Sequence, residues 1–183
     1  FLDLPNNSRL RFSFFQGTTP NLIKGLKEEA YDLIFCSYAE AEEDIEFIPV
    51  FRQDLVLAVP IGHPFAITNS VVLKELANSP LITYNKETAL GKATLELFEK
   101  SNISPNIASE AYNEQAIYGL VSEGLGISIV AHTPDILNYH IKTIPINNEL
   151  CYRYVYMAYF KNRYLTPAVD RFISFVKSSS IDI

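Results

Sequence analysis

The sequence contains few of the residues and patterns that identify a class of protein directly. Only two cysteines, Cys36 and Cys151, occur in 183 residues, so the chain carries no disulfide framework. No apolar run approaches the ~18 residues that a helix needs to cross a bilayer, so we expect no membrane contact. The 15 lysine and arginine residues form no block and the formal net charge is −6. This excludes the basic surface that is typical of a nucleic-acid-binding domain.

Enzyme and metal signatures are also scarce. The chain contains no P-loop, no G-x-S-x-G turn and no histidine pair at metal-ligand spacing. His63 precedes a proline in a turn, and no recognised ligand pattern of cysteine or acid accompanies His132 or His140. We therefore expect no metal site, no cofactor and no catalytic residue.

The chain does contain a regular alternation of strand and helix patterns. Arg9–Phe15 alternates polar and apolar residues as a strand does, a helix follows, and Tyr31–Cys36 indicates a second, buried strand. The same order recurs later, with strands at 81–84 and 107–111, a helix at 88–101, and a further helix that Asn113 caps and Gly124 ends. This order predicts an α/β fold.

The connection between lobes must be made by strands if the chain has two lobes, because it contains no Gly/Ser linker. Val56–Val59 and Tyr154–Tyr159 are the candidates for these crossing strands. Both lie in long extended patterns, at 54–60 and 152–160.

Candidate binding residues follow the predicted strands, where ligands collect in open α/β sheets. Thr18 and Thr19 open one helix, Tyr112 and Asn113 open another, and helix starts offer backbone N–H groups to anions. A hydroxyl and an amide come from a third loop, Tyr84–Asn85. An equally simple alternative is that Thr19 and Asn113 only cap their helices.

Several segments resemble one family in the family's own order. Asp54–Ala66 (DLVLAVPIGHPFA), Leu120–Val130 (LVSEGLGISIV) and Leu165–Phe172 (LTPAVDRF) are similar to segments of LysR-type transcriptional regulators. Tyr31-Asp-Leu-Ile is similar to the strand that precedes a ligand loop in that family, which places Ser37 in this loop.

The resemblance implies an effector-binding domain of the two-lobed, periplasmic-binding-protein-like (type 2) α/β fold with two crossover strands. The expected lobes are 1–57 together with 156–183, and 58–155, and the family's first strand and helix would be absent from the first lobe. A small-molecule effector, a carboxylate or another small anion, would bind in the cleft between the lobes. The implied ligand-binding residues are Thr18, Thr19, Ser37, Tyr84, Asn85, Tyr112 and Asn113.

The resemblance also implies partners and a location. The whole protein would be a cytoplasmic homodimer or homotetramer that contacts DNA only through a helix-turn-helix domain absent from this chain. Two alternatives stay open: an extracytoplasmic solute-binding protein, and an enzyme such as a dehydratase on the same scaffold. For the enzyme, the candidate general acids near the predicted site are Glu110, Glu114 and His132.

Overall fold

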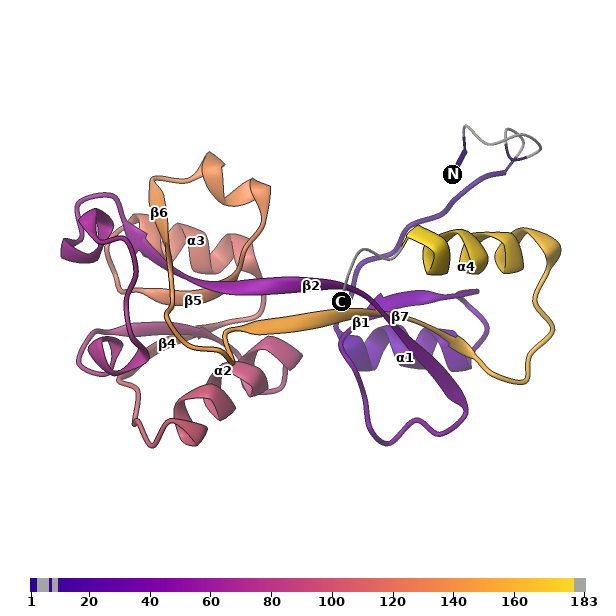
Figure 1. The fold of residues 1–183 in the computed structure, drawn as a ribbon, viewed down its shortest axis with the longest axis horizontal. Helices are drawn as coiled ribbons and strands as arrows, with labels where there is room; N and C mark the ends of the chain where they lie inside the picture. Colours follow the sequence, from indigo (N-terminus) through magenta and orange to yellow (C-terminus); the bar gives the residue numbers. More distant parts are fainter. Residues whose placement is uncertain (3–6, 8–9, 180–183) are drawn as a thin grey trace. The chain divides into compact units, whose positions relative to one another are not determined.

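Residues 1–2, 7 and 10–179 are described by the computed structural model of the chain. The chain divides into two compact units, the first made of 1–52 and 154–183 and the second of 53–153. Strands β2 (Ile45–Pro60) and β7 (Tyr152–Phe160) run through both units (Figure 1). The unit boundaries therefore lie inside strands, at 52/53 and 153/154, where the sequence suggested lobe boundaries at 57/58 and 155/156.

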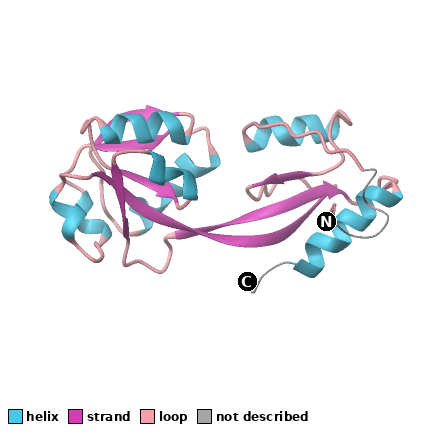
Figure 2. Cartoon of the chain, turned by 90° about the horizontal axis from the view of Figure 1, so that it is seen from above, coloured by secondary structure: helices cyan, strands magenta, loops and turns pink. Residues whose placement is uncertain are grey.

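The first unit has a sheet with a helix layer on each face. Strand β1 (Ile34–Cys36) pairs antiparallel with β7, with Ile34 opposite Ala158. Ala158 packs in one cluster with Leu26 of α1 (Thr19–Lys27), whereas its neighbour Met157 packs with α4 (Pro167–Ser179). Because neighbouring side chains of a strand point to opposite faces, α1 and α4 cover opposite faces of this sheet (Figure 2).

Two sequence expectations in the first unit are wrong. The described part of the predicted strand Arg9–Phe15, from residue 10 onward, has no regular secondary structure, and the predicted strand Tyr31–Cys36 shrinks to the three residues of β1. An alternating pattern only makes a segment suitable for a sheet, because the strand forms by pairing its backbone with another. In the described part of the chain, residues 10–15 have no such partner.

The second unit contains a parallel strand pair and an antiparallel group. Its part of β2 pairs with β5 (Ser128–Ala131) and β6 (Ile141–Pro145), and β3 (Leu81–Tyr84) pairs in parallel with β4 (Ile107–Ala111). Helix α2 (Ala89–Lys100) connects β3 to β4, and α3 (Glu114–Ser122) follows β4. A single apolar cluster runs through these elements. Short 3-10 helices at Pro64–Ile67, Leu73–Leu76 and Pro134–Asn138 close the loops.

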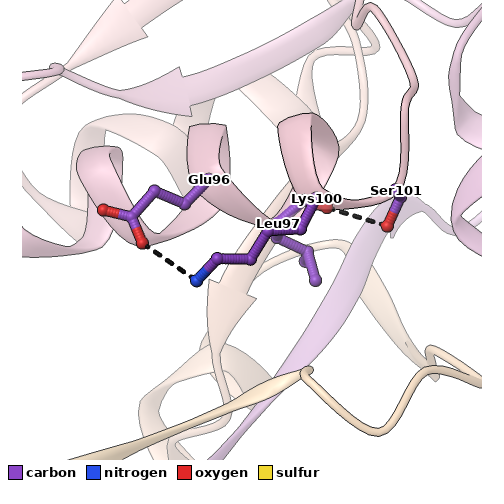
Figure 3. A network of polar contacts seen from close by, with 4 residues as sticks. All are labelled: Glu96, Leu97, Lys100 and Ser101. Atoms are coloured by element: carbon purple, nitrogen blue, oxygen red, sulfur yellow. Dashed lines mark hydrogen bonds and ion pairs between the residues drawn. The ribbon is translucent and has the colours of Figure 1, made fainter.

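The helix ends of the second unit follow local rules. Thr88 caps α2, its Oγ1 accepting from the Gly91 N–H at 3.0 Å, and the last turn carries a Glu96–Lys100 ion pair of 3.4 Å (Figure 3). Both side chains of that pair are more than half exposed, so it contributes at most about 0.5 kcal/mol. Gly124 lies beyond α3 with φ +78°, a left-handed conformation that glycine adopts without strain. The predicted ending of this helix is confirmed.

Candidate functional site

The carboxyl ends of β3 and β4 bring one group of predicted site residues together in the second unit. The strands are parallel, with Tyr84 in register with Ala111, so their ends lie at one edge. The Asn85 N–H donates to the Ala111 carbonyl at 2.8 Å, which joins the loop after β3 to the loop after β4. Tyr84 and Asn85 therefore lie beside Tyr112 and Asn113, at the start of α3.

The two asparagines of this group have structural roles. The Asn113 Oδ1 accepts from the Ala116 N–H at 2.9 Å, so Asn113 caps α3. Asn85 donates from Nδ2 to Glu110 Oε2 at 2.8 Å, and its Oδ1 accepts from the Glu87 N–H at 2.9 Å. A Cβ at Gly91 would collide with the Asn85 carbonyl, so α2 presses closely against this loop. The loop is thus held in place from several sides.

Tyr84 differs from its neighbours because its side chain is buried. It is only 2% exposed, and its hydroxyl has no hydrogen-bond partner within the described residues. Burial raises the pKa of Tyr84 above its ordinary value, and the negative charges of Glu114 and an ionised Tyr118 add to this. Arg153 and the backbone of Ala131, which lies near the hydroxyl without forming a hydrogen bond of good geometry, lower it. The phenol therefore stays neutral at physiological pH and can both donate and accept a hydrogen bond.

Arg153 is the residue of this site that sequence reasoning missed. Its Nε donates to Gln53 Oε1 at 2.7 Å, and the Gln53 Nε2 donates to the His132 carbonyl at 3.4 Å. Burial lowers the pKa of Arg153, whereas Tyr84 and Glu114 favour its charged form. The only sequence signal was a cation between two tyrosines of a strand pattern, Tyr152 and Tyr154.

Two hydroxyl groups lie close to each other beside α3 in the same unit. The buried Tyr118 of α3 has its hydroxyl 3.3 Å from the Thr133 Oγ1. The negative charge of an ionised Tyr118 raises the pKa of Tyr84, so the two side chains lie within electrostatic reach of each other. The second unit therefore combines one partly buried cation, one carboxylate and neutral hydroxyls.

The first unit holds the other predicted residues. The Ser37 N–H donates to Thr19 Oγ1 at 3.3 Å, which ties the loop after β1 to the start of α1. Thr18 occupies the N-cap position, but its side chain makes no capping hydrogen bond. The first turn of α1 contains no acidic residue, so nothing there opposes the positive end of the helix dipole. Ser37 therefore lies beside Thr19, and Thr18 is the residue before Thr19 in the chain.

The chemistry of both groups suits hydrogen bonding to a polar ligand. Among the described residues, no cluster of three histidine, cysteine or acidic side chains could hold a metal ion. Of the acids suggested for an enzyme, Glu110 accepts a hydrogen bond from Asn85. Glu114 lies close enough to Tyr84 and Arg153 for its negative charge to raise the pKa of both. His132 is exposed on the surface.

These features define a ligand-binding domain, and comparison with known proteins places it in a family. Residues 6–180 match the LysR substrate binding domain, so the chain belongs to that family. The HTH-type transcriptional regulator YybE of Bacillus subtilis is 33% identical over 176 residues, which are 96% of this chain and 59% of YybE. The chain thus spans somewhat more than half of that relative.

Solved structures confirm the predicted α/β fold with two lobes and two crossover strands. The effector binding domain of QuiR in complex with shikimate is 38% identical, with a TM-score of 0.87 over 92% of this chain and 81% of that one. The effector binding domain of a BenM variant has a TM-score of 0.84 at 20% identity, covering 94% of this chain and 82% of that one. The chain is the effector-binding domain of a LysR-type regulator, a class whose matched relatives are transcriptional regulators. No helix in the described part of the chain is long and apolar enough to span a membrane.

Proposed function

We propose that the effector of this domain is a small hydroxylated carboxylate and that Tyr84 and Arg153 contact it. The observation that carries the proposal is the buried Tyr84 hydroxyl without a hydrogen-bond partner in the described residues, in the electrostatic reach of Arg153. An unsatisfied buried polar group costs about 1–3 kcal/mol, which a ligand hydroxyl or carboxylate would recover on binding.

The charge and polarity of the surroundings support this ligand class. Arg153 supplies positive charge for a carboxylate, and Glu114 accepts hydrogen bonds from ligand hydroxyls. Asn85, Tyr112 and Asn113 would line the same place, because the loops after β3 and β4 are joined. Shikimate, which the QuiR domain binds, is a ring carboxylate with three hydroxyls and therefore the first compound to test.

The three predicted residues of the first unit would recognise a polar group as well. The exposed N-terminus of α1 and the hydroxyls of Thr18, Thr19 and Ser37 suit an oxyanion or a hydroxyl. Binding would use hydrogen bonds only, with no bond made or broken in the ligand.

The whole protein would use this domain to control transcription in the cytoplasm. Relatives matched here carry the name HTH-type regulator, and the chain covers 59% of YybE, which leaves room for a DNA-binding domain in the rest. Effector binding would shift the domain between conformations and so change the geometry of a homodimer or homotetramer on DNA.

Titration calorimetry with shikimate tests the ligand proposal. We expect Tyr84→Phe to weaken binding about tenfold, the equivalent of one lost hydrogen bond of ~1.4 kcal/mol, without lowering the melting temperature. The stability is kept because the hydroxyl makes no hydrogen bond of good geometry, and only its contact with the Ala131 backbone is lost.

The matched control is Tyr164→Phe, since Tyr164 is 82% exposed in the first unit and should leave binding unchanged. Unaltered affinity in Tyr84→Phe would contradict the role of Tyr84. Absence of binding by shikimate and by other hydroxylated carboxylates would contradict the ligand class. Chemical change of shikimate on incubation would show an enzyme instead.

A further inference from the structure

Glu114, the first residue of α3, places a carboxylate on the inner face of that helix. Residues four and seven positions apart lie on one face of a helix, so Glu114 shares its face with Tyr118 and Val121. Tyr118 and Val121 are buried in the apolar cluster of the second unit, and Glu114 itself is half-buried. The Glu114 carboxylate is therefore on the side of α3 that packs against the sheet.

The surroundings of Glu114 favour its negative charge and respond to it. The helix dipole places positive partial charge at the start of α3, which stabilises a carboxylate in the first turn. Glu114 raises the pKa of both Tyr84 and Arg153, so its charge reaches these two side chains. The buried Tyr84 hydroxyl is thus exposed to one negative charge, from Glu114, and one positive charge, from Arg153.

The second acid at this edge of the sheet points away from Tyr84. Glu110 of β4 is in register with Thr83, whereas Tyr84 is in register with Ala111. Because neighbouring side chains of a strand point to opposite faces, Glu110 lies on the opposite face from Tyr84. Glu110 is also exposed, so water and salt screen its charge. Glu114 is therefore the carboxylate that a ligand bound at Tyr84 would meet.

The balance of charge at this place suits one ligand carboxylate. Arg153 attracts a first carboxylate, but a second one would have to lie near Glu114. Two like charges repel strongly in a half-buried place, because water screens them less than it does at the surface. A ligand hydroxyl in the same position would instead donate a hydrogen bond to Glu114.

We propose that Glu114 determines the charge class of the effector: the site accepts a monocarboxylate with a hydroxyl that reaches Glu114, and it rejects a dicarboxylate of similar shape. The inference rests on the proposed function, in which Tyr84 and Arg153 contact a hydroxylated carboxylate. It adds a repulsive element, which discriminates against the wrong ligand as well as favouring the right one.

Two ligands that differ in one group test the proposal. The trans isomers of 4-hydroxycyclohexanecarboxylate and cyclohexane-1,4-dicarboxylate share a ring and one carboxylate, and the second carries a carboxylate where the first carries a hydroxyl. Titration calorimetry with these two compounds and with shikimate measures the affinities. We expect the unaltered chain to bind the hydroxy acid about a hundredfold more tightly than the dicarboxylate, because like charges meet only in the dicarboxylate complex.

Glu114→Gln removes the charge and keeps the shape of the side chain. We expect this substitution to raise the affinity for the dicarboxylate by on the order of tenfold or more and to narrow the preference accordingly. Loss of a merely structural contact would weaken all three ligands, so a gain for the dicarboxylate reports on the charge. Glu123→Gln is the matched control, since Glu123 is exposed at the other end of α3 and should keep the original preference. Added salt should narrow the preference of the unaltered chain, because it screens the repulsion.

The possible failures separate this inference from the proposed function. If the unaltered chain binds shikimate but binds the dicarboxylate as tightly as the hydroxy acid, the role of Glu114 is overturned and the proposed function stands. An unchanged preference in Glu114→Gln also overturns it, because the discrimination would then be steric. If neither the unaltered chain nor Glu114→Gln binds any of the three compounds, the ligand class and the inference fall together.

Discussion

The two units of the chain have cores of different completeness. The second unit has one continuous apolar cluster through its sheet strands and helices, whereas the first has two smaller clusters and a cavity of about 440 Å³ lined by residues 10–15 and 30–35. Among the described residues, the segment 10–15 of the first unit pairs with no strand despite its alternating pattern, whereas β3 and β4 of the second unit pair with each other. The difference shows that similar sequence patterns give different structures, because a strand forms only where its backbone pairs with another.

Truncating core leucines should give the largest contrast between the units. Leu57→Ala, at a side chain with no exposure in the second unit, should lower the free energy of unfolding by about 2–5 kcal/mol. Leu22→Ala, at a half-buried side chain that lines the cavity of the first unit, should lower the free energy of unfolding by only about 1 kcal/mol, because less apolar surface is lost.

Urea denaturation measures both values. Equal costs for the two substitutions in the unfused chain would contradict the difference between the units.

The cysteines provide a comparison by pH. Burial raises the pKa of Cys36 in the first unit and of Cys151 in the second to about 11, from 9.0. The folded chain should hold about a hundredfold less thiolate at pH 8 than unfolded chain, and alkylation should be slower to the same extent.

The same shift has a consequence for stability. The pKa of each thiol is higher in the folded chain than in the unfolded chain. The contribution of the two protonated thiols to the stability of the fold is therefore complete below about pH 9 and is lost as the pH rises towards about 11. Mass spectrometry of each alkylated peptide checks the rates. Faster labelling of Cys36 than of Cys151 would show that the first unit opens more often, and slower labelling would argue against an incomplete core.

Helix caps should show the smallest effect. Asn113→Ala should cost about 1 kcal/mol, because its Oδ1 accepts from the Ala116 N–H in the second unit. Thr18→Ala, at the N-cap of α1, should lower the free energy of unfolding by a few tenths of a kcal/mol at most, because the Thr18 side chain makes no capping hydrogen bond. Thermal melts of both variants measure the loss of stability. A larger loss in Thr18→Ala than in Asn113→Ala would contradict this prediction.

Much of the second unit could be predicted from local patterns. The bounds of β3, β4 and β7 and the end of α3 at Gly124 agree with the sequence expectations. These elements depend on neighbouring residues, through alternation, a side-chain cap and a left-handed glycine. The unpaired segment 10–15 was wrongly predicted, since its pattern says nothing about whether a partner strand is present.

The candidate site divides in the same way. The positions after β3 and β4 followed from strand order alone, since parallel strands end at one edge. The contact between Arg153 and Gln53 could not be predicted in this way. The two residues lie 100 positions apart in the chain and come together only because two long strands run side by side.

The sequence by itself determined the α/β alternation, the helix caps and the family resemblance, because each of these depends on residues that are close together in the chain. The tertiary structure decided the burial of Tyr84, the contact between Gln53 and Arg153, and the pairing of β1 with β7. The physical reason is that burial, electrostatic neighbours and strand pairing depend on residues far apart in the chain.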